Sequence, residues 1–340
     1  MRVAVAMSGG LDSTASAFIL KKSGHDVTGL HVRLHAGSDA SWEMARDAAE
    51  QIGVPINKVD LSHEFQELVI RCFVEEYSRG RTPSPCPVCN RFIKMTLLFD
   101  QARELGCEKL ATGHYAQIGG TPEEPLLLRG ADKRKDQSYF LFMLTRDILK
   151  RTLFPVGQLT KTRVRELLRA EGISLWQSDE SQELCFVPDG NYRSFLRDHG
   201  IESQAGPVVD SLGRTLGKHK GIANYTVGQR RGLGICGPKP FYVLRVDPES
   251  NTVTVGTREE TLRSGFTIDK ITLLASGGPS IGDRFDVKIR STSPVVPCTI
   301  VGYGDDSMEI RFETPQAGVA PGQAAVLYSG DMVVGGGWIV

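Results

Sequence analysis

The first residues of the chain that could do chemistry form a glycine turn, Ser-Gly-Gly-Leu-Asp-Ser, at residues 8–13. The apolar run at residues 3–7 predicts a buried strand before it, and residues 14–22 have the composition of a helix. Glycines let the backbone approach a ligand closely, and the N–H groups and dipole of a helix N-terminus favour negative charge. The turn therefore predicts an anion-binding cradle. A kinase-type phosphate loop would end in Gly-Lys-Ser/Thr, which this turn does not, so γ-phosphoryl transfer is not the expected chemistry.

A second group of reactive residue types is the Cys-X-X-Cys pair Cys86 and Cys89, in a proline-rich loop. Residues 91–105 after it carry apolar side chains at helical spacing, and Asn90 is the expected N-cap of that helix. Because the start of a helix stabilises a thiolate, the sequence predicts a reactive thiol here. The pair is also half of a zinc site, but a second pair of ligands at matching spacing is missing.

The other cysteines are scattered. Cys185 is a third candidate thiol, and the sequence alone does not tell whether it meets Cys89. An odd total of 7 cysteines in 340 residues does not fit the disulfide framework of a secreted protein. We expect buried structural thiols at the remaining positions, which are Cys72, Cys107, Cys236 and Cys298.

Composition and charge are those of an ordinary globular protein. Lysine plus arginine balance aspartate plus glutamate at 40 each, which argues against non-specific packaging of nucleic acid. Residues 129–169 and 211–239 are nevertheless basic, which indicates either solvated surface or a local contact with a polyanion. No run of about 18 apolar residues predicts a membrane-spanning helix, and the N-terminus lacks a signal-peptide pattern. We therefore expect a cytoplasmic protein without a membrane partner.

The elements that would position these residues change in kind along the chain. Strand patterns at residues 27–32, 56–61 and 109–112 alternate with helix patterns, which predicts an α/β domain with a doubly wound parallel sheet. Ligands bind such sheets at the carboxyl ends of the strands, where the glycine turn, Val32 and Gly113 would meet. After about residue 200, short β-branched runs separated by turn residues predict small β-barrel or sandwich modules.

We divide the chain accordingly into a catalytic domain at residues 1–198, a central glycine-rich basic β domain at 199–262 and a C-terminal β-barrel at 263–340. The glycine-rich segment 217–237 is expected to join the two halves of the chain.

Several motifs together resemble one family. The turn at residues 8–13 resembles the pyrophosphate loop of enzymes that cleave ATP between the α- and β-phosphates. Further motifs follow in the order ATGHYA (111–116), KDQSYFL (135–141), LCFV (184–187), YTVGQRRGLG (225–234) and PGQA (321–324). Over essentially its whole length the chain is similar to the tRNA-specific 2-thiouridylases, N-type pyrophosphate-loop (PP-loop) ATP pyrophosphatases with a Rossmann-like catalytic domain.

The resemblance implies a sulfurtransferase that modifies tRNA with ATP and Mg²⁺. ATP would adenylate the C2 oxygen of the wobble uridine, with release of pyrophosphate and with Asp12 as a catalytic residue. Cys185 would carry sulfur as a persulfide received from a relay protein or a cysteine desulfurase. Cys89 would release that sulfur by forming a disulfide with Cys185. The uridine must leave the anticodon stack, which a single-stranded loop permits.

The resemblance also implies binding residues. Those of the nucleotide site would be Ala6, Met7, Ser8, Gly9, Gly10, Leu11, Asp12, Ser13, Val32 and Gly113. Those in contact with tRNA would be His114, Lys135, Asp136, Gln137, Arg290, Ser291 and Gln323. These placements bring both basic stretches near the RNA.

One departure from the family pattern bears on the sulfur chemistry. Members commonly carry Asn-Pro-Asp with the aspartate three residues before the first catalytic cysteine, whereas this chain has Ser84-Pro85-Cys86. Cys86, Cys89 and Cys185 are the minimum ligand set of an iron–sulfur cluster with one open iron, which could bind sulfide and replace the persulfide route. Alternatively, Cys86 is a spectator or a spare resolving thiol.

Two competing functions remain at this stage. A synthetase with the same fold could join nitrogen to an adenylated carbonyl, and such an enzyme would need no paired cysteines. A non-catalytic tRNA-binding protein could retain a vestigial loop, but the intact turn at residues 8–13 argues against that.

Overall fold

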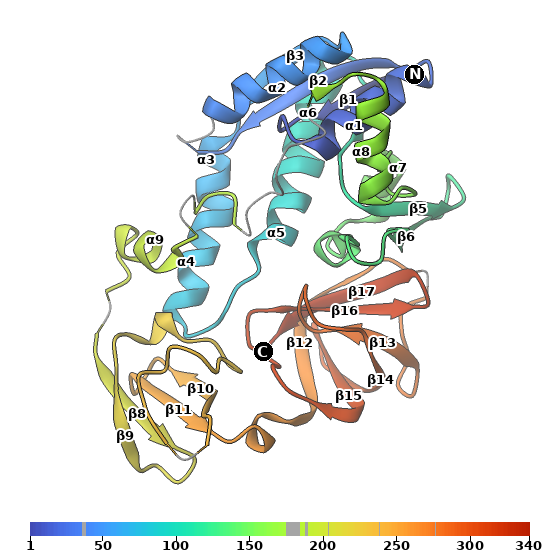
Figure 1. The fold of residues 1–340 in the computed structure, drawn as a ribbon. Coiled ribbons are helices and arrows are strands. Elements are labelled where there is room, and N and C mark those ends of the chain that lie inside the picture. Colours follow the sequence, from blue (N-terminus) through green and yellow to red (C-terminus); the bar gives the residue numbers. More distant parts are fainter. Residues whose placement is uncertain (36–38, 175–183, 188–189, 203, 238, 276) are drawn as a thin grey trace.

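The computed structural model describes residues 1–35, 39–174, 184–187, 190–202, 204–237, 239–275 and 277–340. They form a parallel sheet flanked by helices, a small central sheet and a C-terminal barrel (Figure 1). In this described part of the chain, no helix is both long and apolar enough to cross a membrane.

The first sheet is parallel throughout. Its strands are β1 (Arg2–Ala6), β2 (Asp26–Arg33), β3 (Ile56–Asp60), β4 (Lys109–Ala111) and β7 (Thr152–Leu153), in the order β3-β2-β1-β4-β7. Helices α1 (Leu11–Lys22), α2 (Asp39–Ile52) and α8 (Lys161–Ala170) pack with Val3 and Val5 of the central strand. Ala4 belongs to the core on the opposite face, because successive residues of a strand point to opposite sides. The predicted doubly wound α/β fold is confirmed.

Two long helical segments cover that opposite face, and each contains a π-helical stretch. One runs through α3 (Ser62–Phe65), η2 (Gln66–Ile70) and α4 (Arg71–Ser78), the other through α5 (Pro85–Val88), η3 (Cys89–Leu97) and α6 (Leu98–Glu104). The second segment begins with Pro85, which suits a first turn because proline has no N–H to satisfy. The predicted N-cap at Asn90 is therefore wrong: Asn90 lies inside the helix, and its Nδ2 donates to the Phe140 carbonyl oxygen at 3.1 Å.

A β-hairpin that the sequence patterns did not reveal follows β4. Its strands are β5 (Ala116–Gly120) and β6 (Pro125–Arg129), and Leu128 of β6 pairs with Met332 of the C-terminal barrel. The hairpin therefore joins the N-terminal domain to the barrel. Further helical elements of this domain are η4 (Ser138–Leu141), α7 (Arg146–Lys150) and α9 (Tyr192–Asp198).

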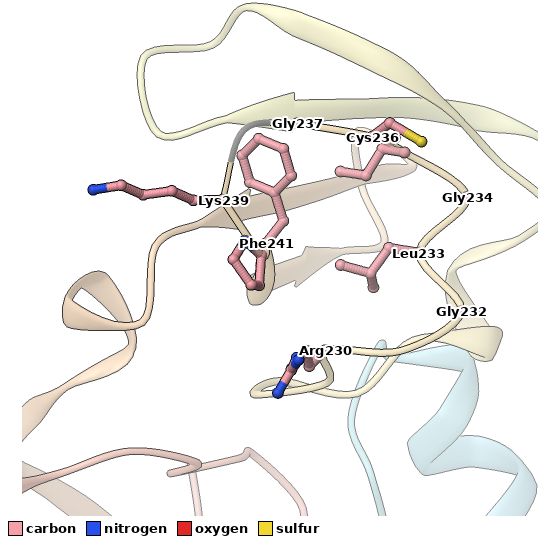
Figure 2. Close-up of a pocket in the computed structure, with 10 residues that line it drawn as sticks. Arg230, Gly232, Leu233, Gly234, Cys236, Gly237, Lys239 and Phe241 are labelled. Atoms are coloured by element: carbon pink, nitrogen blue, oxygen red, sulfur yellow. The ribbon is translucent and has the colours of Figure 1, made fainter.

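The central module is a mixed sheet in the order β10-β11-β8-β9, built from β8 (Gly206–Asp210), β9 (Thr215–His219), β10 (Tyr242–Asp247) and β11 (Thr252–Gly256), with the 3₁₀ turns η6 (Ile222–Asn224) and η7 (Glu259–Thr261). Residues 217–237, expected to be a connection, start inside β9 and belong to this module. Their glycine-rich end borders an open pocket of about 470 Å³, which is lined by Leu233 and Phe241 together with Arg230 and Lys239 (Figure 2).

The C-terminal domain is a closed antiparallel barrel, as predicted. Its strands are β12 (Arg263–Leu273), β13 (Arg284–Lys288), β14 (Val296–Tyr303), β15 (Ser307–Gln316), β16 (Ala324–Ser329) and β17 (Met332–Ile339). They follow the order β12-β15-β14-β13-β16-β17, and pairing of β12 with β17 closes the ring. Closure leaves no unpaired edge strand in the ring, and the apolar side chains of alternate positions fill its interior.

The cysteines outside the candidate site differ in exposure. Cys107 and Cys298 are buried, as expected. The same expectation is wrong for Cys72 and Cys236, which are exposed. Cys72 lies on the outward face of α4 and Cys236 in the loop of the central module, so an apolar sequence neighbourhood did not translate into burial.

Candidate active site

The glycine turn between β1 and α1 has the geometry of an anion cradle. Gly9 has a φ of +81°, and a Cβ there would lie 2.6 Å from the Cβ of Met44, so a larger residue does not fit. Gly10 is the N-cap of α1, and its carbonyl oxygen accepts hydrogen bonds from the hydroxyls of Ser13 and Thr14, each at 3.0 Å. No side chain caps the start of α1. The N–H groups of its first turn are therefore available to an anion.

Asp12, in the first turn of α1, is held from two sides. The Nζ atom of Lys161 lies 2.8 and 2.7 Å from its two carboxylate oxygens, and the Tyr115 hydroxyl donates to Oδ1 at 2.8 Å. Burial, together with the carboxylate of Asp12, raises the pKa of Tyr115, which keeps this hydroxyl a donor. Sequence reasoning missed Lys161 because it is 149 residues away from Asp12 along the chain.

The other residues implied in nucleotide binding surround the same turn. Ala6 ends β1, and Met7 follows it directly; Val32 lies near the end of the neighbouring β2, and Gly113 follows β4 on the other side of β1. A Cβ at Gly113 would lie 2.7 Å from the carbonyl carbon of Asp12, so glycine lets the two segments touch. The structure thus brings these residues together at the carboxyl edge of the sheet, where such folds bind ligands.

The three candidate thiols share one neighbourhood. Cys86 and Cys89 lie one turn apart at the start of the second long helix, and Cys185 is near enough for its charge to raise the pKa of both. Cys89 is buried, Cys86 is half-buried and Cys185 is exposed. Within the described residues, no group of three histidine, cysteine or carboxylate side chains is arranged to hold a metal ion.

Burial decides the protonation of these thiols. Desolvation raises the pKa of Cys89 to about 12 and also raises the pKa of Cys86 and Cys185, so all three are protonated at neutral pH. The prediction that a helix start favours the Cys89 thiolate is therefore wrong. The helix begins at Pro85, which places Cys89 inside it, and at Cys86, in the first turn, desolvation outweighs the backbone contribution.

Lys94 is a cation within this neighbourhood. Its ammonium lowers the pKa of Cys86, Cys89 and Cys185 and so opposes the effect of burial. Lys94 lies five residues after Cys89 in η3, where i→i+5 bonding brings both residues toward one face of the helix. In an ordinary α-helix that spacing points to different faces, which is why the sequence did not reveal Lys94.

His114 feels the same cation as the thiols, Lys94. It directly follows Gly113, and its Nδ1 lies 2.7 Å from the Thr112 hydroxyl. Desolvation of the ring, with a further contribution from the Lys94 ammonium, lowers the pKa of His114 to about 3. At neutral pH the ring is therefore an uncharged hydrogen-bonding group next to Gly113.

Lys135, Asp136 and Gln137, implied in RNA contact, are tied to the protein. The Asp136 side chain is 1% exposed and accepts hydrogen bonds from Nε of Arg129 at 3.1 Å and from two backbone amides. Oε1 of Gln137 accepts from the amide of Tyr115 at 3.0 Å. Asp136 and Gln137 thus shape the chain next to the glycine turn, and Lys135 is half-buried beside them.

Arg290 and Gln323, also implied in RNA contact, lie where the three domains meet. Arg290 donates from Nη2 to the Val227 carbonyl oxygen at 2.6 Å and from Nε to a barrel carbonyl oxygen at 2.9 Å. Nε2 of Gln323 donates to the carbonyl oxygen of Thr82, in the loop before the Cys-X-X-Cys pair, at 2.7 Å. Ser291 is half-buried in the turn after Arg290. These residues fasten the central module and the thiol-bearing loop to the barrel.

Family models match the chain in three consecutive parts. The tRNA methyl transferase HUP domain matches residues 1–189, the tRNA methyl transferase PRC-barrel domain residues 193–257 and the aminomethyltransferase beta-barrel domain residues 263–339. The U34-tRNA thiolase NcsA from Methanococcus maripaludis is a more distant structural neighbour, with a TM-score of 0.37 and 18% identity over 58% of this chain and 65% of that chain.

Curated proteins match over nearly the whole length. The tRNA-specific 2-thiouridylase MnmA of Geobacter metallireducens is 45% identical, over 99% of this chain and 96% of that protein. The protein of the same name from Symbiobacterium thermophilum is 41% identical, over 99% of this chain and 92% of that protein. With this identity, this coverage and the three matching domain models, the chain belongs to the family of tRNA-specific 2-thiouridylases.

Proposed function

We propose that this chain catalyses the ATP-dependent 2-thiolation of the wobble uridine of tRNA. The observation that carries the proposal is that one domain of a member of this family holds an anion-binding glycine turn and three thiols, and that Lys94 acts electrostatically both on the thiols and on His114, which follows the Gly113 that contacts Asp12. A reaction that first activates an oxygen and then replaces it with sulfur needs both centres side by side.

The glycine turn supports the first half-reaction. The phosphates of ATP would lie against the N–H groups at the start of α1, and the adenosine against the end of β2 near Val32. The C2 oxygen of the uridine attacks the α-phosphorus, the bond from that phosphorus to the bridging oxygen breaks, and pyrophosphate leaves with the electron pair. The carbonyl oxygen, a poor leaving group, thereby becomes part of AMP, a good one.

Mg²⁺ fits this site through Asp12. Magnesium is usually bound by one or two carboxylates together with phosphate oxygens, and the Asp12 carboxylate lies at the start of the helix where the phosphates would be. When bound, the ion would neutralise charge on the polyphosphate.

The thiols support the second half-reaction. We assign the sulfur carrier to Cys185, which is the exposed thiol and so the one that a sulfur-relay protein or a cysteine desulfurase can reach. The terminal sulfur of its persulfide attacks C2 and AMP departs. The thiolate of Cys89 then attacks Sγ of Cys185, which forms a disulfide and leaves the sulfur on the uridine. A thiol reductant must reduce that disulfide before the next turnover.

A second candidate route uses an iron–sulfur cluster on Cys86, Cys89 and Cys185. It is favoured by the three thiols in one neighbourhood and by the replacement of the family's aspartate by Cys86. Because their arrangement here does not hold a metal ion, we derive no step through a cluster. Iron and acid-labile sulfide in the anaerobically purified protein decide between the routes. Stoichiometric amounts that vanish in Cys86→Ala support the cluster, and no iron in either protein supports the persulfide.

The RNA would bind across the domain junction. We propose that His114 and Ser291 face the nucleic acid with Lys135, and that Asp136, Gln137, Arg290 and Gln323 hold the surface that it contacts, since their side chains are bonded to the protein. The cytoplasmic location expected from the sequence stays a prediction.

The test is a reconstituted reaction with tRNA, ATP and a sulfur donor, followed by analysis of the nucleosides. We expect 2-thiouridine in the tRNA and one AMP for each thiolated uridine. AMP formation without any 2-thiouridine would overturn the proposal in favour of a nitrogen-joining synthetase. ATP–pyrophosphate exchange stimulated by tRNA distinguishes an enzyme from a protein that only binds RNA.

A further inference from the structure

Cys185 belongs to a short turn whose next side chains are buried. The structure describes residues 184–187 of this segment, and the amide of Val187 donates to the Leu184 carbonyl oxygen at 3.1 Å. Phe186 is 6% exposed and Val187 is 3% exposed, whereas Cys185 is exposed. The residues that follow the thiol therefore attach the turn to the core, and the thiol itself stays accessible.

The ring of Phe186 lies among three other aromatic rings, which together we call the aromatic cage. Its centroid is 5.8 Å from that of Phe65 in α3, 5.2 Å from that of Phe73 in α4 and 5.1 Å from that of Phe195 in α9. The ring planes are inclined by 67°, 85° and 56°, close to the edge-to-face arrangement that aromatic pairs prefer. Neighbours from three helices thus hold the Phe186 ring in one place.

The walls of the aromatic cage are themselves well fixed. Phe65 is 1% exposed and Phe73 is 2% exposed, so both are part of the close-packed core. His199 stacks on Phe195 with ring centroids 4.1 Å apart, and its Nδ1 lies 2.8 Å from the Phe195 carbonyl oxygen. The cage is therefore a rigid framework into which the turn docks.

The aromatic cage is built on the helical segment beside the other two thiols. η2, which connects α3 to α4, packs against α5 and η3, and these two elements carry Cys86 and Cys89. Cys185 is near enough for its charge to raise the pKa of both thiols. A side chain that fixes Cys185 to α3 and α4 therefore also fixes it relative to Cys89.

We propose that Phe186 is a positioning residue for sulfur transfer, which holds Sγ of Cys185 where Cys89 can attack it. In that step the Cys89 thiolate forms a disulfide with Cys185, the bond from Cys185 to the sulfur on C2 breaks, and its electron pair stays with the sulfur on uridine. A disulfide requires the two Cβ atoms to lie about 3.5–4.5 Å apart, so a small displacement of Cys185 slows the step. The inference rests on the proposed function, which assigns these two thiols to sulfur transfer.

The experiment measures the effective concentration of the Cys89 thiol toward Cys185 in the full chain. The protein is equilibrated in glutathione buffers of known composition, and the disulfide between the two residues is quantified by peptide mass spectrometry. For Phe186→Ala we expect at least a tenfold fall, since a misplacement of about 1 Å costs about a hundredfold. Phe186→Leu, which keeps an apolar side chain in the aromatic cage, should recover part of the loss. Phe312→Ala is the matched control, because this ring is 5% exposed in the barrel core and its loss should lower the Tm without changing the effective concentration.

Activity separates positioning from general support of the fold. In a single turnover with persulfide on Cys185, Phe186→Ala should form 2-thiouridine at least ten times more slowly, while pyrophosphate release stays within twofold of wild type. An unchanged effective concentration in Phe186→Ala would overturn the inference. Equal losses of thiolation and pyrophosphate release, with no recovery in Phe186→Leu, would also contradict it, because they indicate a merely structural role.

Two further features keep the test decisive. Phe195→Ala removes one wall of the aromatic cage and leaves Phe186 in place, so it should lower the effective concentration even if Phe186→Ala does not fold. The disulfide measurement needs neither ATP nor tRNA. A wild type that forms no 2-thiouridine would therefore refute the proposed function, while the effective concentration still decides whether Phe186 positions Cys185.

Discussion

The glycine turn and the thiol neighbourhood belong to the same domain, yet they are prepared for chemistry in opposite ways. At the turn, the Asp12 carboxylate is already paired, with Lys161 and Tyr115 fixed around it. At the thiols, desolvation raises the pKa of Cys86, Cys89 and Cys185, and the ammonium of Lys94 only partly opposes that effect. The charged groups of the glycine turn are in place before substrate arrives, whereas the thiols are still in their unreactive, protonated form.

This difference matches the order of the two half-reactions. A preorganised charged site can bind ATP at once, because its dipoles and charges need no rearrangement. Protonated thiols, by contrast, react more slowly than thiolates with electrophiles and oxidants that reach them from solution. The three cysteines are therefore weak nucleophiles in this state of the protein.

The largest expected effect is the loss of sulfur transfer, with the adenylation step left intact. Replacing Cys185 by serine removes the proposed sulfur carrier, and thiolation should fall by more than about a thousandfold because Cys86 and Cys89 are less exposed to a sulfur donor. Formation of AMP and pyrophosphate in the presence of tRNA should continue. Both products are measured in one reaction by nucleoside analysis and pyrophosphate release. Thiolated tRNA from this variant would show that Cys185 is not the carrier.

The next largest effect is expected at the glycine turn, where a substitution should slow the release of pyrophosphate. Asp12→Ala leaves Lys161 without its partner and removes the carboxylate proposed for Mg²⁺, so tRNA-dependent pyrophosphate release should fall by about a hundredfold. Affinity for tRNA, followed by filter binding, should stay within about twofold of wild type. Asp100→Ala, an exposed carboxylate of α6, is the control. Undiminished pyrophosphate release would remove Asp12 from the mechanism.

The sequence predicted the turn better than the thiols, for a physical reason. A strand, two glycines and a helix start are local features, and local features fixed the positions of Gly9, Gly10 and Asp12. The protonation of Cys89 depends on burial by distant segments and on where the helix begins, and the apparent cap at Asn90 was misleading because Pro85 starts the helix earlier.

The partners that tune both centres were equally invisible in the sequence. Lys161 reaches Asp12 only through the packing of α8 against α1, and Lys94 shares a face with Cys89 only because that helix contains a π-helical stretch. Both are tertiary or irregular features, which residue types and spacing do not encode. The β5–β6 hairpin was missed similarly, since its pairing partner β17 lies in another domain.

A smaller effect is expected when the Lys94 ammonium beside the thiols is removed. Because its ammonium lowers the pKa of Cys185, Lys94→Met should raise that pKa further and reduce the thiolate fraction. Alkylation of Cys185 by iodoacetamide at pH 8, followed by peptide mass spectrometry, should slow measurably because fewer Cys185 side chains are thiolates at that pH. The curve of rate against pH should move to higher pH. Lys150→Met, an exposed lysine paired with Asp147, is the control. An unchanged curve of alkylation rate against pH would show that Lys94 does not affect the pKa of Cys185.

The smallest expected effect concerns the link between the barrel and the thiol-bearing loop. Gln323→Ala removes the hydrogen bond to the Thr82 carbonyl oxygen, which is worth about 1 kcal/mol, or about fivefold. Since Thr82 leads to Cys86 and not to the glycine turn, the loss should be seen in the rate of thiolation at saturating ATP and not in pyrophosphate affinity. Gln316→Ala, whose side chain bonds within its own strand to Thr314, should change neither quantity. Equal losses at both centres would mean that the barrel supports the whole catalytic domain, and that the two centres are not held independently.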